Sequence, residues 1–143
     1  MNAANDISVC ATCLCVASRQ AARAITSVYD RRLRPHGIRI TQFTILANLM
    51  LRGPTALGVL AKKLGLERTT LTRNLALLDA RGWVVIRPGD ADSRSRIITV
   101  TGAGRALVHE AFPDWRKAQQ QASDAFGQAS VAALHKLAGA ALQ

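Results

Sequence analysis

Residues 57–101 read LGVLAKKLGLERTTLTRNLALLDARGWVVIRPGDADSRSRIITVT, and this stretch is the most informative about the fold. Leucines recur at three- and four-residue spacing over 57–64 and again over 67–81, which predicts two amphipathic helices. Gly65 leaves room only for a tight turn between them, and Gly82 ends the second helix. The pattern is typical of a helix-turn-helix unit.

Directly after the second helix, the hydrophobic period changes from helical to extended. Residues 83–86 and 97–100 are rich in β-branched and aromatic side chains, and the loop between them is polar and charged. Two such runs around a charged loop predict a β-hairpin. Helix, tight turn, helix and hairpin in this order predict a winged helix-turn-helix.

Further helices are predicted on the N-terminal side. Apolar residues at helical spacing predict a helix over 17–34, which Pro35 and Gly37 stop. A second helix is expected to begin with Thr41 as its N-cap and to end at Gly53.

The C-terminal side is also predicted to be helical. Thr101 is expected to cap a long helix that runs to about Phe126 and is kinked by Pro113. Gly127 breaks this helix and a last one follows. The expected fold class is therefore mainly α with a small β-hairpin.

Length and charge limit the kind of partner. The 143 residues suit one domain with helical extensions, and 49% hydrophobic content supports a packed core. Nineteen Lys and Arg against nine Asp and Glu give a formal net charge of +10. Arginine outnumbers lysine 15 to 4, and its guanidinium fork suits phosphates and bases. Codon bias can explain that ratio, but it does not explain the surplus of positive charge, which favours a polyanionic partner.

Several other classes are disfavoured. No uncharged apolar run approaches the ~20 residues that a membrane-spanning helix needs, and no basic residue precedes the first apolar stretch. We therefore expect a cytoplasmic protein without a membrane partner. A phosphate-binding glycine loop, a nucleophile elbow and paired carboxylates are absent from the sequence, so an enzyme is not expected. A non-specific DNA-binding protein with a steep salt dependence is the nearest alternative.

The predicted second helix of the pair carries a candidate DNA-reading face. Its leucine stripe (Leu71, Leu75, Leu78) is expected to be buried, which leaves the polar face outside. Residues near the N-terminus of such a helix reach base edges in the major groove, and an arginine on a hairpin suits a narrow minor groove. The candidate DNA-binding residues are Arg68, Thr69, Thr70, Thr72, Arg73, Arg94 and Arg96. The alternative to DNA binding is that the polar helix face is simply solvated and that the hairpin loop is a surface turn held by local ion pairs.

Several motifs together resemble the MarR family of bacterial regulators, over residues from about 17 to 140. They are Leu71-Thr72-Arg73, Gly82-Trp83-Val84, Asp92-Ser93-Arg94, Val100-Thr101-x-x-Gly104, and upstream Arg34-Pro35-x-Gly37-Ile38 and Gln42-Phe43-x-x-Leu46. Two departures stand out. The wing begins with Pro88-Gly89-Asp90 where Asn-Pro is more usual, and Gly65 shortens the third helix.

The resemblance implies a homodimer. Residues 1–38 would hold the cysteine segment and a dimerisation helix, 39–101 the winged helix-turn-helix, and 102–143 the C-terminal dimerisation helices. The two recognition helices would lie roughly 34 Å apart on a pseudo-palindromic operator. The residues expected in the dimer base are Val28, Leu107, Val108, Phe112, Trp115, Leu134 and Leu137.

The resemblance also implies roles for particular residues and for an effector. Arg73 matches the recognition-helix arginine of the family, and Asp92 matches the wing aspartate that holds the wing arginine, here Arg94. Family members usually repress transcription and leave DNA when a ligand binds or a thiol is modified. We therefore expect a sequence-specific repressor of this kind.

All three cysteines lie in one Cys-x-x-Cys-x-Cys run, at Cys10, Cys13 and Cys15. Three interpretations remain open. The run is a redox sensor in which Arg19 and Arg23 favour a thiolate. Alternatively, it is a thiolate site for a metal, a metalloid or part of an iron–sulfur cluster, with a further ligand from elsewhere. In the third interpretation the cysteines are small hydrophobes at the dimer interface.

A small-molecule effector is the remaining alternative, with purely structural cysteines. The family uses an inter-helix pocket for aromatic acids, so an aromatic or phenolic ligand is implied. The candidate pocket residues are Tyr29, His36, Arg39 and Phe43. The three histidines have no metal-ligand spacing relative to one another.

Overall fold

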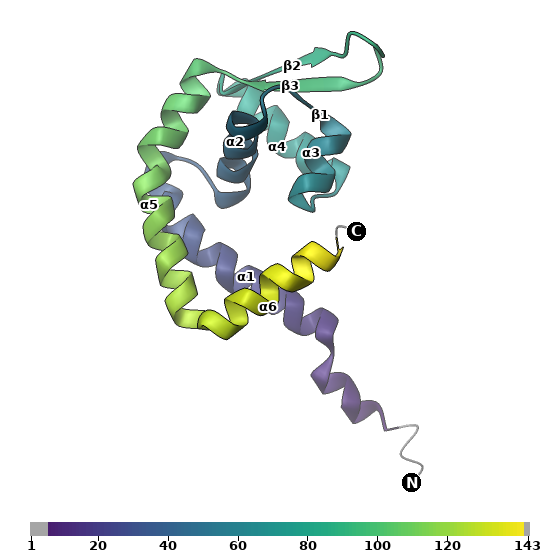
Figure 1. The fold of residues 1–143 in the computed structure, drawn as a ribbon, viewed down its shortest axis with the longest axis vertical. Helices are drawn as coiled ribbons and strands as arrows, with labels where there is room; N and C mark the ends of the chain where they lie inside the picture. Colours follow the sequence, from purple (N-terminus) through teal and green to yellow (C-terminus); the bar gives the residue numbers. More distant parts are fainter. Residues whose placement is uncertain (1–5, 142–143) are drawn as a thin grey trace.

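The structure is a computed structural model that describes residues 6–141. Figure 1 shows a helical protein with one small sheet at one end. The helices are η2 (Ile7–Thr12), α1 (Leu14–Leu33), η3 (Arg34–His36), α2 (Ile40–Arg52), α3 (Leu57–Leu64), α4 (Arg68–Ala80), α5 (Gly102–Phe126) and α6 (Gln128–Ala141). The strands are β1 (Thr55–Ala56), β2 (Val84–Pro88) and β3 (Arg96–Val100).

The predicted hairpin is the outer part of a three-stranded antiparallel sheet with the order β1-β3-β2. β2 and β3 pair from Val84 opposite Val100 to Pro88 opposite Arg96. β1, which was not predicted, adds two residues on the other side of β3, with Thr55 opposite Ile98. A strand of two residues is too short to show an alternating pattern in the sequence.

One hydrophobic core holds the helix-turn-helix, the sheet and the end of α1 together. Its largest fully buried side chains are Leu33, Ile45, Leu46, Leu49, Leu60, Leu71, Leu75, Leu78, Val84 and Ile98. Burying each such side chain stabilises the fold by roughly 1.5–3 kcal/mol. Because α2, α3, α4 and both long strands contribute, the wing is attached rigidly to the recognition helix.

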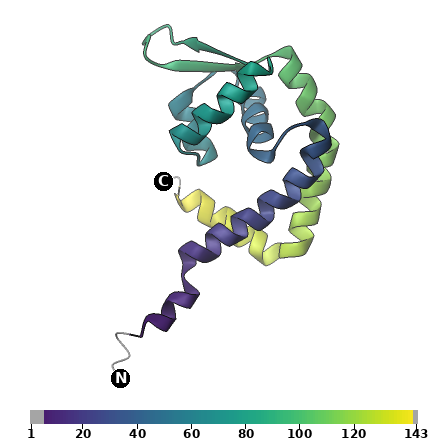
Figure 2. The same cartoon turned by 180° about the vertical axis from the view of Figure 1, so that it is seen from behind.

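The remaining helices form an arm beside this core. α5 leaves the sheet and runs down one side of the molecule to reach α1, against which it packs (Figures 1 and 2). α6 turns back from the end of α5, and η2 projects away from the rest of the chain (Figure 2). No helix within residues 6–141 is both long enough and apolar enough to cross a membrane.

Helix boundaries differ from the prediction where tertiary contacts set them. Thr41 does not cap α2, because the helix begins at Ile40 with Arg39 as its N-cap residue. The carboxylate of Asp30 on α1 accepts the Ile40 N–H at 2.8 Å, and the Gln42 side chain accepts the Arg39 N–H at 3.2 Å. A partner on another helix therefore moves the start of α2.

Other boundaries shift by a few residues. The first long helix begins at Leu14 rather than at 17, and β2 begins at Val84 and extends to Pro88. The long C-terminal helix has the predicted bounds, with Thr101 Oγ1 accepting the Gly104 N–H at 3.1 Å. Pro113 lies inside this continuous helix.

The residues expected in the dimer base differ in exposure: Val28 is half-buried and Phe112 is 44% exposed. Val108 is only 6% exposed and belongs to the protomer's own core, and Leu107 and Trp115 pack partly against that core. Val108 therefore needs no partner to be covered, whereas Leu107 and Trp115 are covered only in part. Leu134 and Leu137 on α6 remain 50% and 67% exposed.

Candidate nucleic-acid interface

Helix α4, the predicted recognition helix, is oriented by its leucines. Leu71, Leu75 and Leu78 are buried on its inner face, so the opposite face must point to solvent. On that face Thr69, Thr72 and Arg73 are exposed, and at its sides Arg68 is exposed and Thr70 is half-buried. Five of the seven predicted DNA-binding residues thus lie in the first half of the helix, three of them opposite the leucine stripe.

The wing carries the other two predicted contacts. Arg94 is exposed at the tip of the wing, and Arg96 is exposed as the first residue of β3. The Arg96 guanidinium donates to the Ser93 carbonyl at 3.2 Å, which folds it back along the tip. The structure therefore places the seven residues in two groups, one on α4 and one on the wing.

Asp92 supports the wing through the backbone. Its carboxylate accepts the Arg94 N–H at 2.9 Å, and its carbonyl accepts the Ser95 hydroxyl at 2.8 Å. The resemblance implied that Asp92 holds the arginine itself. Within residues 6–141 the Arg94 guanidinium forms no ion pair, so what Asp92 holds is the turn that presents the arginine.

The unusual Pro88-Gly89 entry into the wing has a steric reason. A Cβ at Gly89 would lie 2.1 Å from Ser95 Oγ and 3.1 Å from the Asp92 carbonyl. The Gly89 N–H also donates to the Ser95 carbonyl at 3.0 Å. A side chain here would force the Ser95 hydroxyl to rotate and would crowd the Asp92 carbonyl, so this close approach favours glycine.

The base of the wing is locked to the end of α4 by the Thr-x-x-Gly motif. The Thr101 hydroxyl donates to the Gly82 carbonyl at 2.6 Å, and its N–H donates to the Trp83 carbonyl at 3.0 Å. A Cβ at Gly104 would meet the same Trp83 carbonyl at 2.3 Å. This motif therefore fixes how α4, the wing and α5 meet.

The cysteine run lies far along the projecting N-terminal segment (Figure 1). Cys10 lies in η2, Cys13 caps α1 and Cys15 is in its first turn; none is in a disulfide. The Arg19 guanidinium lies 3.6 Å from Cys15 Sγ. Within residues 6–141, no three or more His, Cys, Asp or Glu side chains are grouped to hold a metal.

Neither of the two hollows described below is lined by more than one of the four predicted ligand-pocket residues. Arg39 lines a basic hollow and Phe43 lines an apolar one. The Tyr29 hydroxyl donates to Gln119 on α5, and burial raises the pKa of this tyrosine. The His36 ring binds α5 instead of a shared pocket.

His36 connects η3 to α5 through two carboxylates. Its Nε2 lies 2.8 Å from Asp114 Oδ2 and its Nδ1 lies 3.6 Å from Glu110 Oε1. The hydrogen bond to His36, aided by the charge of Lys117 at 3.6 Å, lowers the pKa of Asp114 below its ordinary value. This cluster ties the region before α2 to the long helix.

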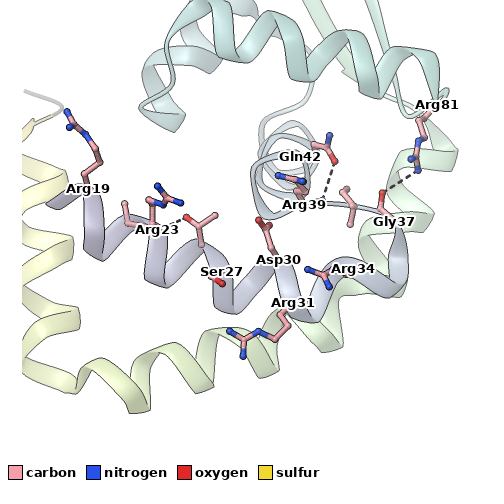
Figure 3. A pocket seen from close by; sticks show the side chains of 13 residues that line it. Arg19, Arg23, Ser27, Asp30, Arg31, Arg34, Gly37, Arg39, Gln42 and Arg81 are labelled. Atoms are coloured by element: carbon pink, nitrogen blue, oxygen red, sulfur yellow. Dashed lines mark hydrogen bonds between the residues drawn. The ribbon is translucent and has the colours of Figure 1, made fainter. Parts of the chain in front are cut away.

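The basic hollow is a feature that the sequence did not predict. It has a volume of about 820 Å³ and lies among α1, the start of α2 and the end of α4 (Figure 3). Arg19, Arg23, Arg31 and Arg34 come from one helix and the residue after it, and their helical spacing was visible in the sequence. Arg39 and Arg81 join them only through the fold.

A smaller hollow lies between α2 and α5. Its volume is about 340 Å³, and its lining is almost wholly apolar (Phe43, Ala47, Met50, Leu51, Val108, His109, Phe112, Trp115). Trp115 stacks with Phe43 at 6.1 Å and with Phe112 at 5.6 Å between ring centroids. Its size and lining suit a small aromatic molecule.

The fold and these features define a winged helix-turn-helix protein, and comparisons with known proteins identify its family. A model of the MarR family matches residues 36–95. The solved transcriptional regulator MosR of Mycobacterium tuberculosis, in complex with DNA, is 38% identical. That alignment covers 90% of this chain and 96% of MosR with a TM-score of 0.79. The chain therefore belongs to the MarR family.

Two further proteins extend the comparison. The HTH-type transcriptional regulator YwoH of Bacillus subtilis, itself uncharacterised, is 32% identical over 82 residues, which is 57% of this chain and 59% of YwoH. The chain thus matches less than two thirds of that relative's length. A mutant of Escherichia coli MarR in complex with operator DNA has a TM-score of 0.79 at 22% identity, covering 97% of this chain and all of that one, and so shares the fold. These relatives are regulators rather than enzymes.

Proposed function

We propose that this protein is a sequence-specific DNA-binding transcriptional repressor that acts on a pseudo-palindromic operator as a homodimer. The observation that carries the proposal is the exposed arginine and threonine face of α4, attached through one core to an arginine-tipped wing. The DNA complex of the 38% identical MosR supports it.

In this proposal each protomer makes two kinds of contact. The first half of α4 enters the major groove, where Arg68 and Arg73 donate to guanine or phosphate and Thr69, Thr70 and Thr72 contact neighbouring bases. The positive end of the α4 dipole adds attraction for phosphates. Arg94 and Arg96 reach the adjacent minor groove from the wing.

The homodimer is proposed from unburied apolar surface on both ends of the chain. Ile7 and Leu14 are 82% and 84% exposed, and Leu134 and Leu137 on α6 are also largely exposed. Residues 1–38 and 102–143 are therefore proposed as dimerisation regions, and 39–101 as the DNA-binding region. Exposed apolar surface of this kind on a folded chain favours association.

The proposed effector acts on the N-terminal cysteines. Cys10 and Cys15 are exposed, so oxidants and soft metal ions can reach their sulfurs, and the Arg19 guanidinium lies 3.6 Å from Cys15 Sγ. Oxidation, or binding of a soft metal, a metalloid or an iron–sulfur cluster with ligands from a second copy, would then alter the dimer. Native mass spectrometry of anaerobically isolated protein distinguishes these species by their added mass. Three free thiols with no added mass would leave oxidation or a purely structural role for the cysteines.

A small aromatic or phenolic effector is the second candidate. The apolar hollow between α2 and α5 favours it, since Phe43, Phe112 and Trp115 offer stacking surfaces. Titration with benzoate or phenol, followed by tryptophan fluorescence, tests this candidate. Unchanged fluorescence at millimolar concentrations would contradict it.

The experiment that tests the main proposal is selection of preferred sites from random duplexes, followed by anisotropy titrations. The wild type should bind its selected site about 10³-fold or more tightly than random DNA. Arg73→Ala should lower that ratio roughly 10- to 100-fold, because one bidentate base contact is worth about 1–3 kcal/mol. Arg116→Ala, an exposed arginine on α5, is the matched control.

Two outcomes would contradict the proposal. Equal affinity for all duplexes with a steep salt dependence would make the protein a non-specific DNA binder. A specificity ratio unaffected by Arg73→Ala would mean that α4 does not read the bases.

A further inference from the structure

We propose that the basic hollow among α1, α2 and α4 binds a phosphorylated small molecule with two or more phosphate groups, and that this ligand weakens DNA binding. The effect on DNA rests on the proposed function. The hollow is lined by Arg19, Arg23, Arg31, Arg34, Arg39 and Arg81. These six arginines come from three separate parts of the sequence.

The positive charge in this hollow is not neutralised by the protein. Within the described chain, none of the six arginines forms an ion pair with an acidic side chain. Asp30 is the only acidic residue in the lining, and its carboxylate already accepts the Ile40 N–H at 2.8 Å. The lining therefore has a formal surplus of five positive charges, which an anion would stabilise.

The geometry suits more than one phosphate. Figure 3 shows Arg23 on α1 and Arg39 before α2 pointing toward one another across open space. An arginine fork binds phosphate oxygens bidentately, and forks on opposite walls can hold neighbouring phosphates of one chain. About 820 Å³ is within the range of small-molecule sites and can also hold a nucleoside. A single carboxylate would leave most of the charge unmatched.

Arg81 connects the hollow to the recognition helix. It is the C-cap residue of α4, its guanidinium donates to the Gly37 carbonyl at 3.3 Å, and it lies 4.9 Å above the Trp83 ring. These neutral partners leave its charge available to an anion. A phosphate held by Arg23 and Arg39 would draw Arg81 toward α1, and because the wing is locked to the end of α4, both would move together relative to α1.

The hollow is distinct from the proposed DNA face. Arg68 and Arg73 lie in the first half of α4, whereas Arg81 follows its last turn. A helix of 13 residues is about 20 Å long. Phosphate binding at the hollow can therefore be separated by mutation from phosphate binding at the DNA face.

The test is isothermal titration of the full-length protein with sodium tripolyphosphate at fixed ionic strength and without divalent cations. Wild type should bind with a micromolar dissociation constant, and Arg23→Ala/Arg39→Ala should weaken binding at least tenfold. Arg73→Ala and Arg116→Ala should leave it within twofold. ATP titrated in parallel distinguishes a nucleotide ligand from a bare phosphate chain. If ATP binds more tightly than tripolyphosphate, the hollow recognises a nucleotide. If the two bind equally, the hollow recognises the phosphates alone. Both support the inference.

The functional arm measures anisotropy of labelled DNA carrying the selected site. Saturating tripolyphosphate should raise the dissociation constant for DNA about tenfold in wild type and leave it unchanged in Arg23→Ala/Arg39→Ala. Without tripolyphosphate, the double variant should bind DNA as wild type does. Lower DNA affinity of the ligand-free double variant would instead make the hollow a DNA-backbone surface and would overturn the inference.

Other results overturn it as clearly. Absence of tripolyphosphate binding, or equal binding by wild type and the double variant, removes the site. If a second copy of the chain covers the hollow, tripolyphosphate will not bind there, and the inference is overturned. If sulfate at matched ionic strength weakens DNA binding as much as tripolyphosphate does, the effect is charge screening and not binding in the hollow. If the protein binds specific DNA but does not bind tripolyphosphate, the inference fails and the proposed function stands. If the protein does not bind specific DNA, the proposed function fails.

Discussion

Two glycines at the start of α5 differ in their surroundings. A Cβ at Gly104 would lie 2.3 Å from the Trp83 carbonyl and 2.9 Å from Val100 Cγ2, whereas one at Gly102 would meet nothing within 4 Å. The glycine of the Thr-x-x-Gly motif is thus explained by a contact between α5 and the base of the wing.

Gly104→Ala should lower the free energy of unfolding by about 1–3 kcal/mol, because the new methyl group would collide with the Trp83 carbonyl. A backbone carbonyl cannot move away as a flexible side chain can. Gly102→Ala should leave it unchanged or raise it by up to about 1 kcal/mol, since alanine restricts the unfolded chain. Urea denaturation followed by circular dichroism measures both. Equal effects of the two substitutions would contradict the proposed role of this close approach.

Arg94 has a prediction of its own because Asp92 holds its backbone rather than its charge. Arg94→Ala should weaken DNA binding about tenfold at sites flanked by A/T, because one charged hydrogen bond is lost. The loss should be smaller at sites flanked by G/C, because their minor groove is wider and attracts an arginine less. Anisotropy with paired duplexes that differ only in the flanks measures this. A uniform loss at both sites would mean a simple phosphate contact.

At the scale of elements, His36 and Asp114 fasten η3 to α5. Since the pKa of Asp114 is lower in the folded protein than its ordinary value of 3.8, the contact stabilises the fold above that pH. The stabilisation is lost as the pH falls below 3.8 and through the pKa of the folded state. α5 thereby holds the segment that leads into α2.

Asp114→Asn should therefore lower the thermal unfolding midpoint at pH 7, with a difference from wild type that shrinks below pH 3.8. Asp124→Asn, on the exposed part of the same helix, serves as control and should have a smaller effect at pH 7. Differential scanning fluorimetry from pH 2.5 to 7 gives the comparison. A difference that is independent of pH would argue against the ionised contact.

The elements also differ in how far the sequence predicted them. α3, α4 and α5 were predicted within a residue or two, because each has an apolar stripe and a glycine or threonine at its end, and α6 was predicted to follow the break at Gly127. β1 and the start of α2 were not, because Thr55 pairs with Ile98 and Ile40 with Asp30. Such partners give no local signal.

At the scale of the whole molecule, exposed leucines on α6 predict where a second copy binds. Leu134→Glu/Leu137→Glu should convert the protein to a folded monomer and weaken operator binding about 100-fold or more, since two linked half-sites bind far better than one. Lys136→Glu on the same helix should remain dimeric. Light scattering and circular dichroism measure mass and folding. A dimeric double variant would place the interface elsewhere.

The order of the helices, the wing, the α4 face and the family could all be predicted from the amino-acid sequence, because they depend on local periodicity and on motifs within short stretches. The arginine spacing on α1 was visible there too. Three features emerged only from the folded chain: Arg39 and Arg81 join that arginine row, Val108 belongs to the protomer core, and Arg39 and Phe43 line different hollows. Contacts between distant segments follow from how helices pack in three dimensions, and that packing depends on the whole core at once.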